Sequence, residues 1–260
     1  MDLNLAGKNV LVTGSAGLIG SELCRQLAAE GANLLLLDVS PKNAELHREL
    51  TERHPRSTFV HSTLNVAHED TAKAIAAILE DAFDATLHGL VNAVQYKSQS
   101  FFHDIKDTSL DELQDIFAAN VFSIFWMMKH LTPYLRNARG ASVVNLSSTY
   151  AIVSPNPDLY VGTSLGCPPT YVATKGAVHS LTKYLACYLA KDGIRVNSVT
   201  PHGVHNNHQD TFVRNFSKLS PQQRMSEKQE VAPAIMLLLS GKSSYMTGAN
   251  VEIDGGWTAW

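Results

Sequence analysis

The sequence predicts an α/β fold: a doubly wound, mainly parallel seven-stranded sheet with helices on both faces, in a single domain over residues 1–260. Two observations predict it. Short apolar runs alternate with amphipathic stretches along the whole chain, which favours right-handed β-α-β units. Several of the runs are apolar almost throughout, as is typical of strands that are covered on both faces.

Each element follows from its pattern. The apolar runs predict strands at 8–13, 33–38, 57–61, 87–94, 141–147, 194–200 and 249–252. The amphipathic stretches predict helices at 18–30, 44–53, 69–81, 111–137, 171–191 and 227–239. Ligands bind such sheets at the carboxyl ends of the strands. We therefore expect the site in the loops that follow Thr13, Ser147 and Thr200.

The composition excludes several classes of protein. Residues are 45% hydrophobic and 17% charged, unlike a disordered chain or a long charged helix. The net charge of -3 is opposite to that of a nucleic-acid binder, so no nucleic-acid partner is expected. No run approaches the roughly 18 apolar residues that span a bilayer, and the first residues do not resemble a signal peptide. We expect no membrane partner and a cytoplasmic location.

The three cysteines are Cys24, Cys167 and Cys187. An odd number without a Cys-x-x-Cys spacing disfavours a disulfide framework and a cysteine-built zinc site. Cys167 is expected to pack within a loop, because nothing near it marks an activated thiolate.

A glycine-rich turn, Gly14, Gly17 and Gly20, joins the first predicted strand to the first helix. Glycine lets the backbone turn sharply and approach a pyrophosphate, and the helix N-terminus then faces the phosphates. Alone, such a turn could equally just connect a strand to a helix. Asp38 ends the second predicted strand, where a carboxylate can bind both hydroxyls of an adenosine ribose and repel a 2′-phosphate. NAD(H) is therefore preferred and NADP(H) disfavoured.

Tyr171 and Lys175 are four residues apart in a predicted helix, which places them on one face, about 5–6 Å apart at Cβ. An ammonium near a phenol stabilises the phenolate and lowers the pKa of the tyrosine from about 10. Such a tyrosine can exchange a proton with an alcohol or ketone while hydride moves to or from a nicotinamide. The spacing alone also occurs in ordinary helical pairs.

Taken together, these motifs resemble those of the short-chain dehydrogenase/reductase family, in the family's order and over nearly the whole chain. The matching segments are the glycine turn, Asp38, Asn92-Ala93, Asn120, 145–148, Tyr171 with Lys175, 195–201, Thr247-Gly248 and 254–256. The resemblance is to the short branch of the family. It implies a Rossmann-like fold, a small-molecule alcohol or ketone as substrate, and a homodimer or homotetramer.

The resemblance also implies residue roles. Tyr171 would donate or accept the proton, Lys175 would lower its pKa and bind the nicotinamide ribose, and Ser148 would hold the substrate oxygen, with Ser147 as an alternative. Asn120 would support a water-linked proton path, although a buried asparagine bonded to backbone is also consistent with the position. The implied cofactor site comprises Thr13, Gly14, Gly17, Leu18, Ile19, Gly20, Asp38, Asn65, Asn92, Ala93, Tyr171, Lys175, Pro201 and Val204.

The chain departs from the family at several points. The Thr-Gly-x-x-Gly-x-x-Gly turn is typical of the sugar-nucleotide branch, Asn65 replaces a frequent aspartate, and Gln95 replaces a glycine, so its side chain should turn aside or contact substrate. The segment 149–170 is long and is expected to be an active-site insertion, with 202–225 as the substrate loop.

Within that loop, His202, His205 and His208 have a spacing that suggests zinc. Gly203 and the asparagines at 206–207 argue against a regular helix there, and the inferred chemistry needs no metal. We expect no metal, with the histidines in the substrate loop or on the surface.

The expected function is that of an NAD(H)-dependent oxidoreductase that interconverts a secondary alcohol and a ketone on a small polar, sugar-like substrate. The long loop and the C-terminal Gly-Gly-Trp also resemble bacterial reductases of flagellin-glycan and nonulosonic-acid pathways. Two alternatives stay open: a dinucleotide-binding sensor or interaction protein without turnover, and a sugar epimerase or dehydratase that retains NAD.

Overall fold

Seven parallel strands form one sheet in the order β3-β2-β1-β4-β5-β6-β7. The structure is a computed structural model that describes residues 2–98, 101–102, 104–163, 165–166 and 168–260. The strands are β1 (Asn9–Thr13), β2 (Asn33–Leu37), β3 (Phe59–Ser62), β4 (Gly89–Asn92), β5 (Ser142–Leu146), β6 (Arg195–Pro201) and β7 (Asn250–Ile253). The predicted single-domain, doubly wound sheet is confirmed, and it is parallel throughout rather than mainly so.

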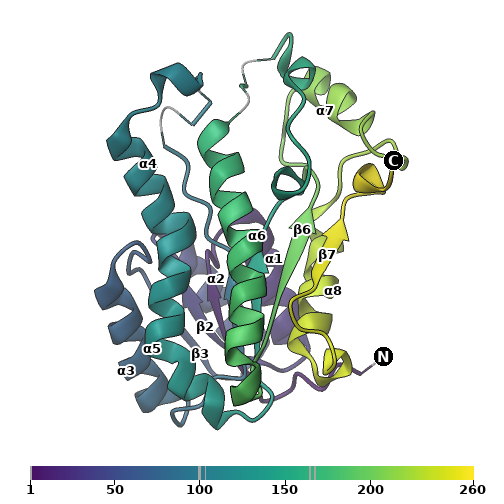
Figure 1. Ribbon diagram of the computed structural model, residues 1–260. Coiled ribbons are helices and arrows are strands. Elements are labelled where there is room, and N and C mark those ends of the chain that lie inside the picture. The colour runs from purple at the N-terminus through teal and green to yellow at the C-terminus, as the bar shows by residue number, and fades with distance from the viewer. Residues whose placement is uncertain (1, 99–100, 103, 164, 167) are drawn as a thin grey trace.

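Helices cover both faces of the sheet (Figure 1). On one face lie α3 (Glu69–Ala82), α5 (Ser123–Asn137) and α6 (Pro169–Leu189), with α4 (Leu110–Phe117) preceding α5 along the same side. On the other lie α1 (Leu18–Ala29), α2 (Lys42–Arg53) and α8 (Lys228–Leu239). The short α7 (Asp210–Ser217) stands beyond the carboxyl ends of the strands.

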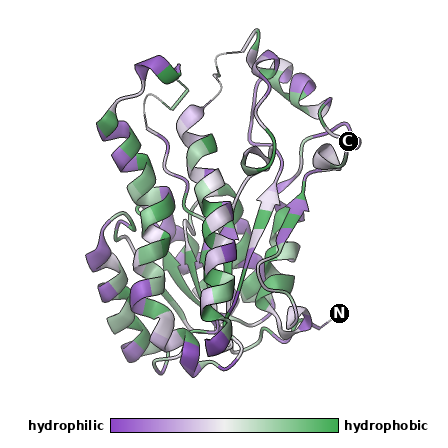
Figure 2. Ribbon diagram, viewed as in Figure 1, coloured by the Kyte–Doolittle hydropathy of each residue, from purple (hydrophilic) through white to green (hydrophobic). Residues whose placement is uncertain are grey.

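The apolar strands explain the two layers. Along β2, Leu35 and Leu37 pack with α3 and α5, whereas Leu34 and Leu36 pack with α1 and α2, because successive side chains of a strand point to opposite faces. Figure 2 shows that the strands of the sheet are largely apolar, whereas the helices carry both apolar and polar residues. Each fully buried leucine stabilises the fold by about 1.5–3 kcal/mol relative to an exposed one. The sheet therefore gives the loops at its carboxyl edge a rigid base.

Two helical regions differ from the prediction. The helix expected over 111–137 is present but not uniform: α4 and α5 are joined by a π-helical segment, Ala118–Phe122. A π segment widens the helix by one residue per turn and often marks a functional position. The second difference is α7, which was not predicted because it is only 8 residues long and adjoins a segment rich in histidine and asparagine.

Cys24 is buried, Cys187 is exposed, and both are free thiols. The packing predicted for Cys167 concerns a position outside the described residues. Within the described ranges, no helix is both long and apolar enough to cross a membrane.

Candidate active site

A cavity of about 650 Å³ lies at the carboxyl ends of the strands. The glycine turn after β1 and the ends of β2 and β3 line one end of it. The loops after β4, β5 and β6, the start of α6 and α7 line the other end. Its volume lies within the range of about 300–1,000 Å³ that small-molecule and cofactor sites occupy.

Two glycines of the turn allow close backbone approach. Gly14 has a φ of +71°, and a Cβ there would lie 2.7 Å from the carbonyl oxygen of Ala93. A Cβ on Gly20 would overlap the carbonyl oxygen of Gly14. Gly17 is the N-cap of α1, and no side chain caps this end of the helix. The backbone N–H groups of the first turn can therefore bind a ligand. This cradle suits a pyrophosphate.

Asp38 lies beside the turn, directly after β2. Its Oδ2 accepts a hydrogen bond from the backbone N–H of Ala16 at 3.0 Å, and its Oδ1 accepts one from that of Ser40 at 2.8 Å. The carboxylate is thereby held at the wall of the cavity, which Asn65 also lines. Among the described residues that line the cavity, none is an arginine, and both lysines lie toward the other end. This end therefore accommodates ribose hydroxyls better than a phosphate.

Tyr171 stands in the first turn of α6 and hydrogen-bonds with Ser148, which follows β5. The ring of Tyr171 packs edge-on against Phe101 at 5.8 Å and against Tyr150 at 6.2 Å between centroids. Burial raises the pKa of Tyr171, and the hydrogen bond to Ser148 opposes that rise. The two flanking rings fix the direction in which the phenol points.

Lys175 lies one turn further along α6 and is only 3% exposed. Its Nζ donates to the carbonyl oxygen of Leu146 at 2.7 Å and lies 5.6 Å from the centroid of the Tyr171 ring. Burial lowers the pKa of Lys175 to about 8. The predicted lowering of the Tyr171 pKa by this ammonium is absent in this structure, where burial of the phenol dominates.

Three predicted residues lie behind the cavity wall. Asn92 donates from Nδ2 to the Oδ1 of Asn145 at 2.8 Å, and the Thr13 hydroxyl donates to the carbonyl of Val91. Asn120, in the π segment, accepts from the backbone N–H of Tyr96 at 2.8 Å. These side chains hold strands and loops together rather than facing the cavity. The predicted residues that do line it are Gly14, Gly17, Leu18, Ile19, Gly20, Asp38, Asn65, Ala93, Ser148, Tyr171, Lys175, Pro201 and Val204.

An aromatic wall at the far end of the cavity was not predicted. Tyr150 and Tyr160, from the segment 149–170, share a hydrogen bond of 2.7 Å between their hydroxyls. Phe212 and Phe216 of α7 pack against each other in a tilted arrangement at 4.9 Å between centroids, and Tyr160 packs on Phe212 at 6.1 Å. The two phenylalanines are four residues apart, a helical spacing that could have revealed this wall.

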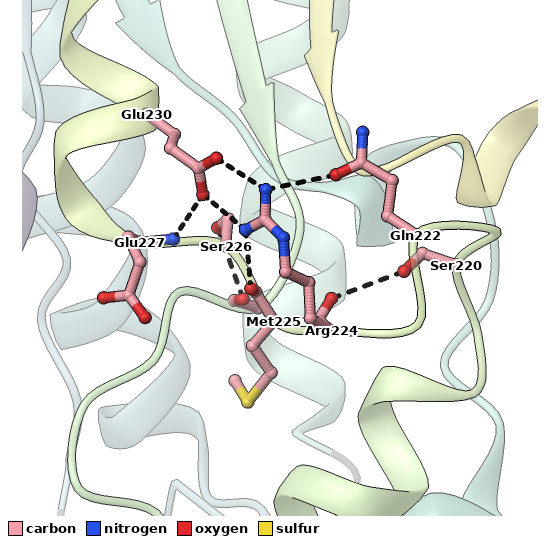
Figure 3. A network of polar contacts seen from close by, with 8 residues as sticks. Ser220, Gln222, Arg224, Met225, Ser226, Glu227 and Glu230 are labelled. Atoms are coloured by element: carbon pink, nitrogen blue, oxygen red, sulfur yellow. Dashed lines mark hydrogen bonds and ion pairs between the residues drawn. The ribbon is translucent and has the colours of Figure 1, made fainter.

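An ion pair between Arg224 and Glu230 fixes the end of the predicted substrate loop (Figure 3). Both terminal guanidinium nitrogens of Arg224 donate to the Glu230 carboxylate at 2.6 Å. Glu230 also accepts from the backbone N–H of Glu227 at 2.8 Å, which caps α8. Ser226, between them, forms an isolated β-bridge with Val204. The ion pair therefore lies next to the contact that joins the Val204 loop to the start of α8.

The three histidines of that loop do not converge. His202 is buried, with its ring stacked on Phe216 at 4.5 Å, and neither ring nitrogen has a hydrogen-bond partner. Burial lowers the pKa of His202 to about 4. His205 is exposed, and His208 packs on Phe212 at 5.0 Å. Across the described ranges, no three His, Cys, Asp or Glu side chains form a group that could hold a metal.

Gln95, which replaces a glycine of the family pattern, lines the cavity. Its Nε2 donates to the carbonyl oxygen of Tyr96 at 2.9 Å, while its Oε1 is buried without a partner. The side chain is thus turned along its own loop.

Comparison with known proteins shows similarity over the full fold. A family model described as "Enoyl-(Acyl carrier protein) reductase" matches residues 14–258. Galactitol 2-dehydrogenase (L-tagatose-forming) of Cereibacter sphaeroides is 32% identical, and the alignment covers 98% of this chain and 97% of that protein.

Two solved structures superpose closely. A short chain dehydrogenase from Leptospira borgpetersenii with bound NAD+ has a TM-score of 0.87 at 26% identity, covering 99% of this chain and 95% of that one. L-Sorbose reductase from Gluconobacter frateurii, complexed with NADPH and L-sorbose, has a TM-score of 0.86 at 23% identity, covering 99% and 98%. The second likeness shows the fold alone.

Proposed function

Because this chain belongs to the short-chain dehydrogenase/reductase family, and is thus an oxidoreductase of alcohols and ketones that uses a nicotinamide dinucleotide, we propose that it uses NAD(H) on a small polar, sugar-like substrate. One observation carries the proposal. The Tyr171–Ser148 hydrogen bond and the buried Lys175 stand in the same cavity as the glycine turn and Asp38. The sugar-alcohol dehydrogenase among the relatives supports a polyhydroxylated substrate.

The residues at the glycine end fit a dinucleotide. The cradle between Gly14 and Gly20, which side chains would fill, leaves room for the pyrophosphate at the start of α1. The carboxylate of Asp38 would accept hydrogen bonds from the ribose hydroxyls and repel a 2′-phosphate. This charge supports NAD(H) over NADP(H).

The bound nicotinamide supplies hydride transfer, and the chain handles the proton. Ser148 would orient the substrate oxygen, and Tyr171 would give its proton to that oxygen in reduction or take it in oxidation. Lys175 would bring positive charge to the phenolate that reduction leaves behind. A positioned acid or base of this kind contributes roughly 10²–10⁴-fold to the rate. Asn120 would act through the Tyr96 backbone that it binds.

Two further features support parts of the proposal. The segments 149–170 and 202–225 line the far end of the cavity, as substrate loops would. Exposed aromatic side chains lie on the π segment, α5 and α6, namely Phe122, Phe125, Tyr184 and Tyr188, which supports assembly into a homodimer or homotetramer.

A spectrophotometric screen at 340 nm tests the proposal, with NADH or NAD+ and a panel of keto-sugars, polyols, steroids and acyl ketones. We expect turnover with a polyhydroxylated compound and its loss in Tyr171→Phe. A sensor would bind NADH without turnover on any compound. An epimerase or dehydratase would retain its NAD through purification and show no net change at 340 nm.

A further inference from the structure

The far end of the cavity is unusual in its charge. Among the described residues that line the cavity, the only carboxylate is Asp38, which is bound to Ala16 and Ser40 at the glycine end. The far end instead contains Lys97, from the loop after β4, and His208, from the loop after β6. Lys97 therefore places a positive charge where the substrate would bind, in a chain whose net charge is -3, and His208 adds a neutral hydrogen-bonding ring.

Lys97 has no carboxylate partner among the described residues. Its Nζ lies 5.4 Å from the centroid of the Phe101 ring, and the same ring packs on Tyr171. The ammonium is thus held one aromatic ring away from the proposed acid/base. A cation–π contact at a water-accessible site contributes only about 0.5–1 kcal/mol, which orients the ammonium without neutralising it. The nearby Glu112 carboxylate accepts a hydrogen bond from Ser98 at 2.6 Å.

His208 offers a second donor from the opposite loop. Its Nδ1 accepts a hydrogen bond from the backbone N–H of Asn206, so in the neutral ring Nε2 carries the proton. Burial, the neighbouring His205 and the charge of Lys97 all lower the pKa of His208. His208 and Lys97 line the same cavity, from the loops after β6 and β4.

From this arrangement, and resting on the proposed function, we propose that the substrate carries a carboxylate or phosphate group that binds between Lys97 and His208. Ion pairing and a charge-assisted hydrogen bond would stabilise such an anion where little competing negative charge lies. The carbon that reacts would then lie beside Tyr171, which the Phe101 ring connects to Lys97. The anionic group would select the substrate and fix its orientation.

Calorimetric titration of the NADH-saturated protein tests this with three probes of similar carbon chain: sorbitol, gluconate and sorbitol 6-phosphate. We expect at least one acid to bind about 10-fold or more tightly than sorbitol, as for one hydrogen bond to a charged group. Lys97→Met should remove that preference, and Lys97→Arg should keep most of it. Comparison of the two acids identifies carboxylate or phosphate as the preferred group.

Lys73→Met is the matched control, because Lys73 pairs with Asp70 on the exposed side of α3. Equal binding of sorbitol and both acids, no measurable binding of either acid, or a preference unaffected by Lys97→Met would overturn the inference. Its failure is distinguishable from that of the proposed function. If acids bind in a way that depends on Lys97 but no hydride transfer is found, the inference is supported and the proposed function is not. If neutral polyols are turned over and Lys97→Met has no effect, the proposed function is supported and the inference is not.

Discussion

The Nζ of Lys175 lies 5.6 Å from the centroid of the Tyr171 ring while it donates to the carbonyl oxygen of Leu146. The ammonium therefore stands beside the phenol and is also tied to the end of β5. In this structure burial sets the pKa of both groups, raising that of Tyr171 and lowering that of Lys175. Both shifts disfavour the charged forms of the two side chains. Removing the buried charge of Lys175 should therefore lower activity but raise stability.

Tyr171→Phe should lower turnover by at least about 10²-fold, because it removes a positioned acid/base while the ring and its packing remain. NADH affinity should change little. Steady-state rates and NADH fluorescence titration check both parts. Tyr160→Phe is a matched control, since Tyr160 is also a cavity phenol but has no lysine four residues on. Retained turnover in Tyr171→Phe would falsify the assignment.

Lys175→Met should abolish most activity. It should also stabilise the cofactor-free protein at pH 7 by about 1–3 kcal/mol, because it removes a buried charge. Burial lowers the pKa of Lys175 from 10.5 to about 8, which corresponds to a cost of roughly 3 kcal/mol for burying the ammonium. The folded-state pKa lies below the unfolded one. The buried ammonium therefore lowers the free energy of unfolding of wild type by its full amount below pH 8, and this cost decreases as the pH rises toward 10.5. Urea unfolding at pH 7 and pH 9.5 measures the difference.

Lys183→Met serves as the control for this experiment, because Lys183 is exposed on the same helix. A Lys175→Met protein that is less stable than wild type at pH 7 would show that the Leu146 hydrogen bond outweighs the burial of the charge.

The fold was predictable from sequence because its strands are nearly continuous apolar runs. The boundaries of β2 and α1 differ from the prediction by a single residue at one end. The π-helical turn at Ala118–Phe122 was not predictable, because an apolar helical pattern continues through it and local periodicity does not reveal the contact between Asn120 and Tyr96. Tertiary contacts, rather than local periodicity, determine that feature.

The candidate site was predictable where family motifs coincide with a chemical need, as at Tyr171, Lys175 and Ser148. It was less so for Asn92 and Thr13, whose side chains turn into the structure. The wall formed by Tyr150, Phe212 and their neighbours lies outside those motifs, because it depends on how two loops pack on each other. The charge pattern at Lys97 likewise emerges only when the loops are brought together.

Asp38→Ala should weaken NAD(H) binding more than NADP(H) binding, because only the carboxylate both binds the ribose hydroxyls and repels a 2′-phosphate. Dissociation constants for the four cofactors, from fluorescence or calorimetry, measure the effect. Asp38→Asn tests charge separately from shape. Equal losses for the two cofactors in Asp38→Ala would contradict the specificity argument.

Glu230→Gln should loosen the loop that carries Val204 and Met225, because it weakens the paired hydrogen bonds from Arg224 and the cap on the Glu227 N–H (Figure 3). We expect faster amide hydrogen exchange over 203–227 and a KM for cofactor raised several-fold, with little change in global stability. Glu45→Gln, on the exposed side of α2, is the control. Unchanged exchange in this segment would show that packing alone holds the loop.

His202→Phe should make the free energy of unfolding less sensitive to acid. The ring is buried between Phe216 and Trp257, and burial lowers the pKa of His202 from 6.5 to about 4. Between these two values the unfolded chain binds a proton that the folded protein does not, so wild type loses stability as the pH falls from about 6.5 to 4. The shift corresponds to roughly 3 kcal/mol.

Phenylalanine has a similar shape and no proton to bind, so His202→Phe should lose correspondingly less stability than wild type over this range. Urea midpoints at pH 7 and pH 4.5 measure the difference. His205→Phe provides the comparison, because His205 is exposed on the same loop and its replacement should leave the wild-type response intact. If wild type and His202→Phe lost stability in parallel, the buried imidazole would have to be finding a partner for its proton in the folded state.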